Sequence, residues 1–332
     1  MKKPSILAIL TRQEWDCFLP GETGDWLKSL PGFHTLDPTA PDFGDWEERL
    51  RAHKPDVLVT CWRTPPIPAA LDHLPQYICH LTGTVRRLIP RDLIASGVLV
   101  TNWGSSISRT VAESALMLTL SALRQASHWA VAMHREGQWK TPESKNMSLF
   151  ERRVGLHGFG AIAQNLVPLL RPFDVEIQTY SPSVSDELLA NHGVKRADSL
   201  DDLFSWSQVL VELAGNTPQN FHIVNEDLLR RLPEDGVFVN VGRGAVVDEV
   251  ALIKVAREGN LQVALDVYEK EPLPVDHPFR GMSNVTLMPH MGGPTIDRRR
   301  DAGRHAMANL KAFLENKPLT SVITAEIYDR AT

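Results

Sequence analysis

Short apolar runs rich in Val and Ile alternate along the chain with longer stretches in which apolar residues recur at helical spacing. Runs of the first kind are typical of buried strands, and stretches of the second kind are typical of amphipathic helices. Their alternation predicts an α/β protein with parallel sheets built from β-α-β units. The predicted strands are Ile6–Leu10, Val57–Thr60, Tyr77–Leu81, Val98–Thr101, Val154–His157, Val175–Tyr180, Val209–Leu213, Val237–Val241, Gln262–Val267 and Val285–Met288.

Two long helices divide this pattern. The first covers roughly 109–125, where Thr110 and Glu113 have the spacing of an N-terminal capping box. It lies between two strand-rich halves, so we interpret it as a connecting helix. The second, at 301–316, should return the chain to the first half. We therefore expect an N-terminal domain that the C-terminal segment completes, with a second domain inserted between. The apolar positions near one face of the first helix are Val111, Ala115, Leu118 and Leu123.

The composition is that of a soluble globular protein with room for two domains. The 332 residues are 43% hydrophobic and 23% charged, with a net charge of −5, which gives no overall attraction for nucleic acid or an anionic membrane. The apolar run Ser5–Leu10 is too short for a signal sequence or a membrane span. Arg298-Arg299-Arg300 falls in a helical stretch and is interpreted as a solvated face. Cys17, Cys61 and Cys79 lack metal-type spacing, and we expect buried or half-buried thiols in a reducing, cytoplasmic setting.

A glycine motif follows the predicted strand Val154–His157. Gly158, Gly160 and Ala163 fit the dinucleotide fingerprint, with Ala in the permitted third place. The first glycine allows a tight turn, the second lets the backbone approach a pyrophosphate, and the small third residue packs helix on strand. Glycines also occur at ligand-free turns, but the strand-turn-helix context favours a Rossmann domain. The predicted cofactor contacts in this turn are Gly158, Phe159, Gly160, Ala161 and Ile162.

The residues after the next strand bear on the choice of cofactor. Ser181-Pro182-Ser183 stands where a carboxylate would hold the ribose hydroxyls of NAD(H). Without that carboxylate a 2′-phosphate is not strongly rejected, and no adjacent arginine attracts one. Lys195 and Arg196 are too far along the chain to assign. The sequence therefore leaves NAD(H) and NADP(H) open, leaning slightly to NAD(H), with Ser181 near the ribose.

Three polar residues follow the C-terminal ends of three successive predicted strands: Arg243, Glu271 and His290. In open parallel sheets ligands bind outside these ends. Arginine can grip a carboxylate and polarise a carbonyl group. A histidine can exchange a hydroxyl proton near neutral pH, and a carboxylate beside it would orient the ring and raise its pKa. The three together are what reduction of a 2-keto acid requires.

Each of these residues also has a structural interpretation. Arg243 could close a salt bridge, His290 could be a hydrogen-bonded loop residue, and Glu271 before proline is ordinary turn chemistry. The glycines on both sides of Arg243 favour the close approach of another group to its backbone. The recurrence at three strand ends favours a functional site.

These segments resemble those of the D-isomer-specific 2-hydroxyacid dehydrogenase family, which includes glyoxylate/hydroxypyruvate reductases and phosphoglycerate dehydrogenases. The resemblance covers nearly the whole chain and is densest over 155–293. Segment 240–248 is similar to the arginine segment of the family, 264–274 to its glutamate segment, and 289–293 to its histidine segment. The resemblance implies a flavodoxin-like substrate domain, 1–102 with 297–332, and an inserted Rossmann NAD(P)-binding domain, 103–296.

The resemblance also implies roles for residues. Arg243 would bind and polarise the substrate, His290 would be the acid/base, and Glu271 would tune His290. Asp266 would lie near the nicotinamide. Further cofactor contacts implied in this way are Thr110, Val241 and Gly242.

In the first domain, Leu81–Val85 is similar to the loop that binds the substrate carboxylate in the family. Its backbone N–H groups, at Gly83 and Thr84, would form an anion nest. Arg63 would face the cleft. Trp62 and Trp103 could crowd the pocket or belong to the core.

The chain departs from the family pattern at several positions. Ser181 replaces the usual acid, and Leu213–Thr217 replaces a proline-containing segment. Arg86 and Arg87 stand where the family usually has Asn or Asp. We take this added positive charge to favour a substrate with a second anionic group.

These observations predict an oxidoreductase that transfers a hydride reversibly between NAD(P)H and a 2-keto acid, giving a D-2-hydroxy acid. We expect a homodimer that binds small molecules, without nucleic acid, membrane or metal. Two alternatives stay open: an amino-acid dehydrogenase on the same scaffold, and a non-enzymatic NADH-sensing protein related to the family.

Overall fold

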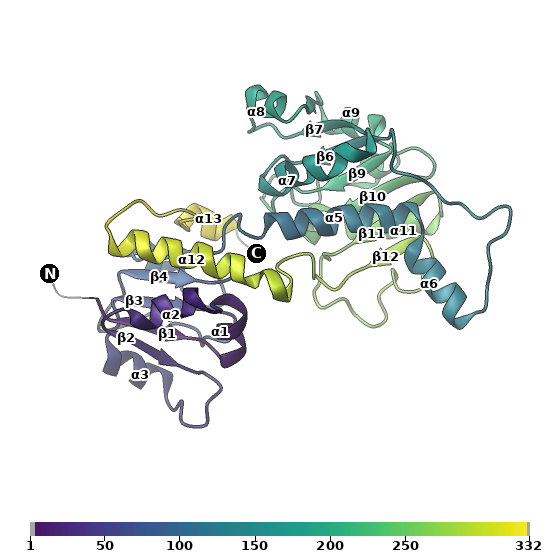
Figure 1. The fold of residues 1–332 in the computed structure, drawn as a ribbon. Coiled ribbons are helices and arrows are strands. Elements are labelled where there is room, and N and C mark those ends of the chain that lie inside the picture. The colour runs from purple at the N-terminus through teal and green to yellow at the C-terminus, as the bar shows by residue number, and fades with distance from the viewer. Residues whose placement is uncertain (1–3, 331–332) are drawn as a thin grey trace. The chain divides into compact units, whose positions relative to one another are not determined.

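The computed structural model describes residues 4–330 and divides into two compact units, one made of 1–107 with 294–332 and the other of 108–293 (Figure 1). Residues 1–3 and 331–332, which the sequence assigns to the first domain, lie outside the described residues. The functional assignment of 1–102 with 297–332 to substrate, and of 103–296 to cofactor, stays a prediction.

The first unit is built on a five-stranded parallel sheet in the order β2-β1-β3-β4-β5. Ile6 pairs with Phe33 on one side and with Val57 on the other, so β1 is an interior strand, and the direction of strand succession reverses between β1 and β3. This is the flavodoxin-like order, confirming the predicted architecture. The strands are β1 (Ile6–Ile9), β2 (Phe33–Leu36), β3 (Val57–Thr60), β4 (Tyr77–His80) and β5 (Leu99–Thr101).

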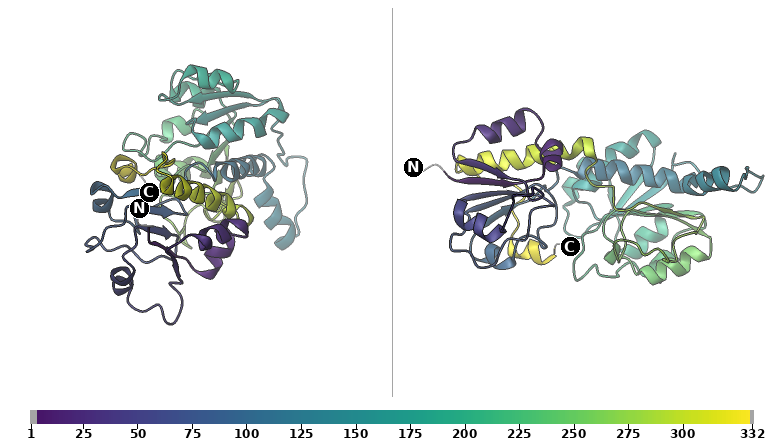
Figure 2. Two further views of the ribbon diagram at one scale, coloured as in Figure 1. Left: turned by 60° about the vertical axis from the view of Figure 1, so that its left-hand side comes forward. Right: turned by 90° about the horizontal axis from the view of Figure 1, so that it is seen from below.

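Helices cover both faces of this sheet because alternate strand residues point to opposite sides. Ile6 and Ala8 pack in one apolar cluster, and Leu7 and Ile9 pack in another. Figure 2 shows α12 running beside α1 on the first of these faces. On this face lie α1 (Arg12–Phe18), α2 (Glu22–Ser29) and α12 (Arg299–Leu314), and on the other lie α3 (Trp46–His53), α4 (Arg91–Ala95) and α13 (Ala325–Arg330).

The second unit is built on a seven-stranded parallel sheet in the order β12-β11-β10-β9-β6-β7-β8. This is the Rossmann order with one added strand, and the succession reverses between β6 and β9. The strands are β6 (Arg153–His157), β7 (Glu176–Tyr180), β8 (Lys195–Arg196), β9 (Val209–Glu212), β10 (Gly236–Asn240), β11 (Leu261–Leu265) and β12 (Val285–Leu287).

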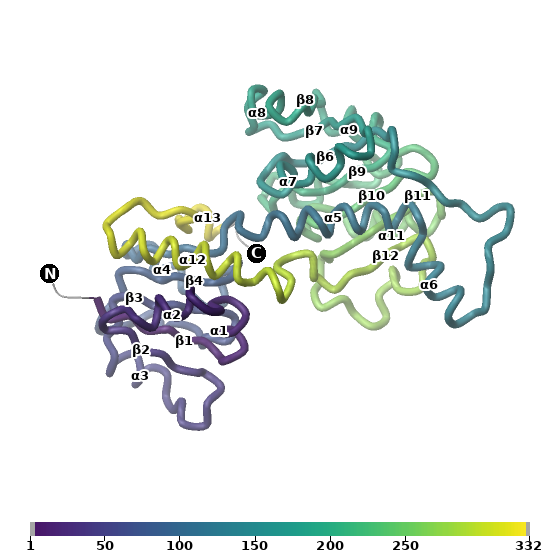
Figure 3. Tube along the Cα trace, in the orientation of Figure 1, coloured from purple at the N-terminus to yellow at the C-terminus, as the bar shows by residue number. Residues whose placement is uncertain are grey.

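The helices of the second unit also lie on both faces of its sheet. One face packs against α9, α10 and α11 through a large apolar cluster that includes Phe204 and Phe238, while α5 packs on α7 and on β10, β11 and β12. A loop without regular secondary structure joins α6 to β6 (Figure 3). The helices are α5 (Ser108–Leu123), α6 (Ala126–Arg135), α7 (Ala161–Leu170), α8 (Asp186–Asn191), α9 (Leu200–Trp206), α10 (Glu226–Leu229) and α11 (Glu249–Arg257), with short 3-10 turns at Arg171–Phe173, Gly244–Val246 and, in the first unit, Ile296–Arg298.

Every strand predicted from an apolar run is present, with ends that differ by at most two residues. Two strands were not predicted. β2 is an edge strand whose central residues, His34 and Thr35, are exposed, and β8 has only two residues. Neither therefore carries the apolar signal of a buried strand. The cysteines are confirmed as buried, with Cys17 only partly covered.

Two local predictions were wrong. Helix α5 begins at Ser108, so Thr110 lies inside its first turn and is not the cap of a capping box. The arginine run is not one solvated face: Arg300 is exposed, but Arg298 pairs with Asp301 at 2.8 Å and the guanidinium of Arg299 lies 4.9 Å from the ring centroid of Trp62. The predicted apolar face of α5 is buried as expected.

Gly303 sets how closely α12 approaches α1. A Cβ atom at this position would overlap the backbone carbonyl of Phe18. Alanine in place of glycine normally stabilises a helix by about 1 kcal/mol. Here we expect Gly303→Ala to destabilise the protein by about 1–3 kcal/mol, because backbone must move to admit the methyl group. Thermal and urea denaturation would measure the change, and a rise in stability would contradict the close approach.

Candidate active site

The glycine turn lies at the point where the strand order of the second unit reverses. Gly158 has a φ of +94°, a conformation that favours glycine. A Cβ on Gly158 would come 3.1 Å from the backbone N and Cα of Ala214, in the loop after β9. Its N–H donates to the carbonyl of Tyr180, at the end of β7, at 2.9 Å. The turn is therefore held against both neighbouring strand ends.

Gly160 and the start of α7 provide a surface for an anion. Gly160 is the N-cap of α7 and makes no side-chain capping bond, and the position of its missing Cβ faces open space. The first N–H groups of a helix need acceptors, and a pyrophosphate can supply them. Ala163 is fully buried, as its packing role requires, and Phe159 is buried as well. A cofactor could contact Phe159 only through its backbone.

Arg196 organises the loop that follows β7. Its Nη1 donates to the carbonyl of Ser181 at 3.0 Å, its Nη2 to that of Val184 at 2.5 Å, and its Nε to Asp186 at 2.7 Å. The sequence left this arginine unassigned because it lies too far along the chain from Ser181, and the two-residue strand β8 brings it back beside β7. The structure thus brings one cationic side chain to the loop where a ribose 2′ group would be read.

The loop after β10 is shaped by Asn240, which sequence reasoning did not single out. The Oδ1 atom of Asn240 accepts the N–H of Gly242 at 3.0 Å, and its Nδ2 donates to the carbonyl of Arg243 at 3.1 Å. A Cβ on Gly244 would overlap the backbone of Tyr268, so this loop packs directly on the segment after β11. The glycines beside Arg243 therefore allow neighbouring backbone segments to pack closely against this loop. The side chain of Arg243 is exposed, and Nη1 donates to the carbonyl of Gly242 at 2.7 Å.

Glu271 and His290 form a hydrogen-bonded pair. The Nδ1 atom of His290 lies 2.6 Å from Oε2 of Glu271, and Oε1 of Glu271 accepts the N–H of Tyr268 at 3.1 Å. Tyr268 also donates its hydroxyl to the carbonyl of Met288 at 2.7 Å, linking the two loops. His290 has a φ of +54°, which a packed loop must hold in place.

Asp266 holds the histidine loop in this conformation. Its two carboxylate oxygens accept the N–H groups of Met291 at 2.7 Å and of Gly292 at 2.8 Å. Asp266 is almost fully buried, and burial raises its pKa although the two N–H donors oppose that shift. A Cβ on Gly292 would crowd this carboxylate and the hydroxyl of Ser114. Asp266 directly follows β11, the strand that precedes Glu271. The end of β11 therefore also holds the loop of His290 in place.

A His–Glu pair alone does not identify a catalytic centre in this chain. His157 and Glu212, at the ends of β6 and β9, form a buried pair at 2.5 Å. Burial alone would lower the pKa of His157, but the charge of Glu212 and its hydrogen bond raise it overall. Surface or loop pairs also join His222 to Glu269 and His277 to Glu249. The pair Glu271–His290 differs because both residues follow strand ends beside the Arg243 loop.

In the first unit the Gly83 loop follows β4. A Cβ on Gly83 would overlap the indole ring of Trp103, and the carbonyl of Gly83 accepts the side-chain N–H of Asn102 at 2.7 Å. Within residues 4–330 the amide N–H groups of Gly83 and Thr84 have no acceptor. Unsatisfied adjacent amides are what an anion nest offers. Trp103 is therefore part of the packing of this loop.

Other residues of the first unit that the sequence singled out include Arg63, Trp62 and Arg86. Arg63 is exposed, and its backbone N–H donates to the buried carboxylate of Glu14 at 2.9 Å. Trp62 is half exposed and packs edge-on against Trp103. Arg86 donates to the carbonyl of Asp329 at 3.1 Å, in α13. The positive charge of Arg86 thus has a structural use.

Comparison with known proteins shows the family. A model described as "D-isomer specific 2-hydroxyacid dehydrogenase, NAD binding domain" matches residues 116–292. The glyoxylate reductase of Thermofilum pendens is 30% identical over 296 residues, covering 85% of this chain and 87% of that enzyme. The chain belongs to the D-isomer specific 2-hydroxyacid dehydrogenases.

Further relatives of this dehydrogenase differ in length and in sequence. The D-3-phosphoglycerate dehydrogenase of Methanocaldococcus jannaschii is 29% identical over 228 residues, which cover 68% of this chain and only 43% of that enzyme. The apo structure of D-mandelate dehydrogenase from Rhodotorula graminis shares the fold, with a TM-score of 0.81 at 22% identity, covering 97% of this chain and 98% of that one.

Family membership makes the chain an NAD(P)-dependent oxidoreductase that interconverts 2-oxo acids and D-2-hydroxy acids. Across the described range, 4–330, no helix has the length and apolar character needed to cross a membrane. The same residues include no group of three or more His, Cys, Asp or Glu side chains placed to hold a metal ion.

His80, missed by sequence reasoning, supports the Gly83 loop of this dehydrogenase. The ring is buried between the hydroxyls of Thr60, 2.9 Å from Nδ1, and Thr82, 2.6 Å from Nε2. Burial lowers the pKa of His80 to about 4, so the ring stays neutral in the folded protein. No sequence signal indicated this role, because His80 stands inside a predicted strand and its partners Thr60 and Thr82 are recognisable only in the folded structure.

The low pKa of His80 makes stability depend on pH. The unfolded state takes up a proton below pH of about 6.5 while the folded state does not, so stability is lost as the pH falls from 6.5 toward 4. Between pH 7 and 5 we expect this residue to remove about 2 kcal/mol from the free energy of unfolding. Urea denaturation of His80→Gln should show a correspondingly flatter pH dependence than the unmodified protein. The matched variant His134→Gln, at an exposed histidine, should keep the original slope, and equal slopes in all three proteins would contradict a neutral buried ring.

Proposed function

We propose that Arg243, Glu271 and His290 are the catalytic residues of this dehydrogenase and that its substrate is a small 2-oxo acid. The observation that carries the proposal is the 2.6 Å contact between Glu271 and Nδ1 of His290. Glu271 is itself oriented by the N–H of Tyr268, and the histidine loop by Asp266. A histidine held in this way presents its other nitrogen, Nε2, to a reacting group.

The chemistry assigned to the residues follows from their charge and position. In the reducing direction, Nε2 of protonated His290 gives its proton to the oxygen of the substrate carbonyl as that carbonyl is reduced. Glu271 stabilises the charged imidazole ring. Arg243 binds the substrate and polarises the carbonyl group. The amides of Gly83 and Thr84 bind the substrate carboxylate.

The nicotinamide cofactor fits the residues of the second unit. When bound, it supplies the hydride. The turn Gly158–Ile162 would hold its pyrophosphate at the start of α7, where the first N–H groups of the helix are donors and the missing Cβ of Gly160 leaves room. Ser181 lies near the ribose, and Thr110, Val241, Gly242 and Asp266 complete the proposed contacts. Removal of water during the reaction requires closure around the substrate.

The first test is the turnover of a panel of 2-oxo acids with NADH and NADPH: glyoxylate, hydroxypyruvate, pyruvate, 4-methyl-2-oxopentanoate and phosphohydroxypyruvate. We expect His290→Asn to lower kcat by about 100-fold or more, because general acid catalysis is lost, and to leave cofactor affinity within about threefold. The matched variant His134→Asn changes an exposed histidine and should retain activity. Unchanged kcat in His290→Asn would remove His290 from the mechanism.

The same panel addresses the alternatives. NADH oxidation that requires ammonia would indicate an amino-acid dehydrogenase. Cofactor binding without turnover of any 2-oxo acid would favour the NADH-sensing function. We further infer a cytoplasmic homodimer, and light scattering of the purified protein tests the oligomeric state.

We also infer that the enzyme accepts NADPH at least as well as NADH, because Arg196 reaches the loop at Ser181 and no carboxylate stands there. This differs from the slight lean to NAD(H) in the sequence. We expect Arg196→Met to lower the ratio of kcat/KM for NADPH to that for NADH by about tenfold, the loss of one charge-assisted contact. Lys195→Met removes an adjacent exposed lysine and should leave the ratio unchanged. A ratio unaffected by Arg196→Met would contradict the inference.

A further inference from the structure

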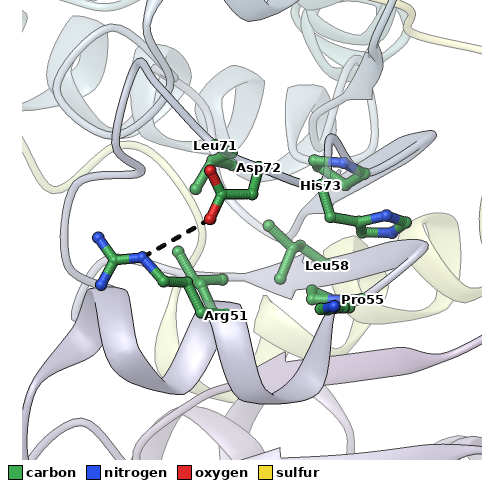
Figure 4. A pocket seen from close by; sticks show the side chains of 9 residues that line it. Arg51, Pro55, Leu58, Leu71, Asp72 and His73 are labelled. Atoms are coloured by element: carbon green, nitrogen blue, oxygen red, sulfur yellow. Dashed lines mark ion pairs between the residues drawn. The ribbon is translucent and has the colours of Figure 1, made fainter.

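A cavity of about 580 Å³ opens at the point where the strand order of the first unit reverses. Its lining comes from the segment after β1, the segment after β2 and the segment after β3, joined by Arg299 from the start of α12. In sheets with this strand order the crevice outside the carboxyl ends of β1 and β3 is the usual ligand position. A second cavity of the unit, between Arg51, Asp72 and Leu58, measures about 70 Å³ and has room for only about two waters (Figure 4).

The larger cavity is lined by three arginines, Arg12, Arg63 and Arg299, and by two acids, Glu14 and Asp37. Neutral N–H and hydroxyl donors satisfy the hydrogen bonding of both carboxylates but leave their charge in place. Three arginines against two acids give the cavity a net formal charge of +1.

The contacts of the two acids are with their own loops. Glu14 accepts the N–H and hydroxyl of Thr11 and the N–H of Arg63, at 2.9–3.1 Å. Asp37 accepts the N–H and hydroxyl of Thr39 and the N–H of Arg12, and the two bonds from Thr39 are the main cause of its lowered pKa.

The arginine side chains have few partners of their own. Within residues 4–330, neither Arg63 nor Arg299 makes an ion pair, and Arg12 makes only a 3.9 Å contact with exposed Asp16. The Nε atom of Arg299 is buried without a hydrogen-bond partner. Its guanidinium lies 4.9 Å from the ring centroid of Trp62, which holds the side chain in place.

The position of Arg299 favours a bound anion. It is the first residue of α12, where the helix dipole disfavours a cation. Asp301, the nearest helix acid, already pairs with Arg298 and Arg304. A bound anion would satisfy the guanidinium of Arg299.

We propose that this cavity binds the distal anionic group, carboxylate or phosphate, of a doubly anionic 2-oxo acid, with Arg299 as the residue that determines this specificity. The proposal rests on the proposed function, in which the Gly83 loop binds the first carboxylate. That loop follows β4, one to two strands away from β3 and β1 in the same sheet. Strand spacing puts these points about 5–10 Å apart, the reach of a short dicarboxylate or phosphorylated acid.

The test compares substrates that differ only in the distal charge. 4-Methyl-2-oxopentanoate carries an uncharged isopropyl group where oxaloacetate carries a carboxylate, and 5-methyl-2-oxohexanoate is the same match for 2-oxoglutarate. We expect Arg299→Met to lower kcat/KM for the charged members by about tenfold or more, mainly through KM. The uncharged members should change by less than about threefold. Arg300→Met removes the adjacent exposed arginine and should affect neither class.

Equal effects of Arg299→Met on charged and uncharged substrates, or no effect on either, would overturn the inference while leaving the proposed function intact. If no 2-oxo acid is reduced, the proposed function fails instead. Calorimetric titration with inorganic phosphate then tests whether the cavity binds an anion, independently of any enzymatic activity. Binding that Arg299→Met abolishes and Arg300→Met preserves would support it, and absence of binding would overturn it.

Discussion

The two hydrogen bonds that the carboxylate of Asp266 accepts from Met291 and Gly292 are the constraint on which the geometry of the proposed catalytic centre depends. They join the end of one strand to the loop after the next and hold His290 at a positive φ. His290 can meet Glu271 at 2.6 Å because both its loop and the Glu271 loop are fixed from the same strand end. The cost of burying a carboxylate is offset here by N–H donors that have no other acceptor.

In both sheets of the dehydrogenase the proposed ligand position lies where the strand order reverses, although the two ligands differ. Where the strand order reverses, neighbouring loops diverge and leave a crevice outside the carboxyl ends of the strands. In the second unit the residues at this point are glycine backbone and a helix start, which suit a pyrophosphate. In the first unit the crevice is lined by arginine side chains. The difference lies in the residues that follow the strands, since the frameworks are alike.

Much of this organisation could be predicted from sequence because it depends on local pattern. Buried strands are apolar runs, so β1 and β10 are recognisable from a few residues. The segments around Gly158 and Arg243 are recognisable because a tight turn or a close backbone contact requires glycine there. The edge strand β2 and the short strand β8 bury too little to show this pattern. The roles of Asn240, His80 and Arg196 depend on which distant backbone atoms they meet, and spacing along the chain carries no information about that.

The division of the first unit into two chain segments has a consequence for the order of folding. The inserted unit, 108–293, is continuous and can form its sheet once its own residues have been synthesised. The first unit cannot, because Ala302, Ala306 and Leu310 of α12 complete the apolar cluster on one face of its sheet. Until α12 is made, that face exposes residues such as Phe18 and Cys79. The earliest part of the chain is thus among the last to be shielded from water, and during synthesis it is the part with most need of a chaperone.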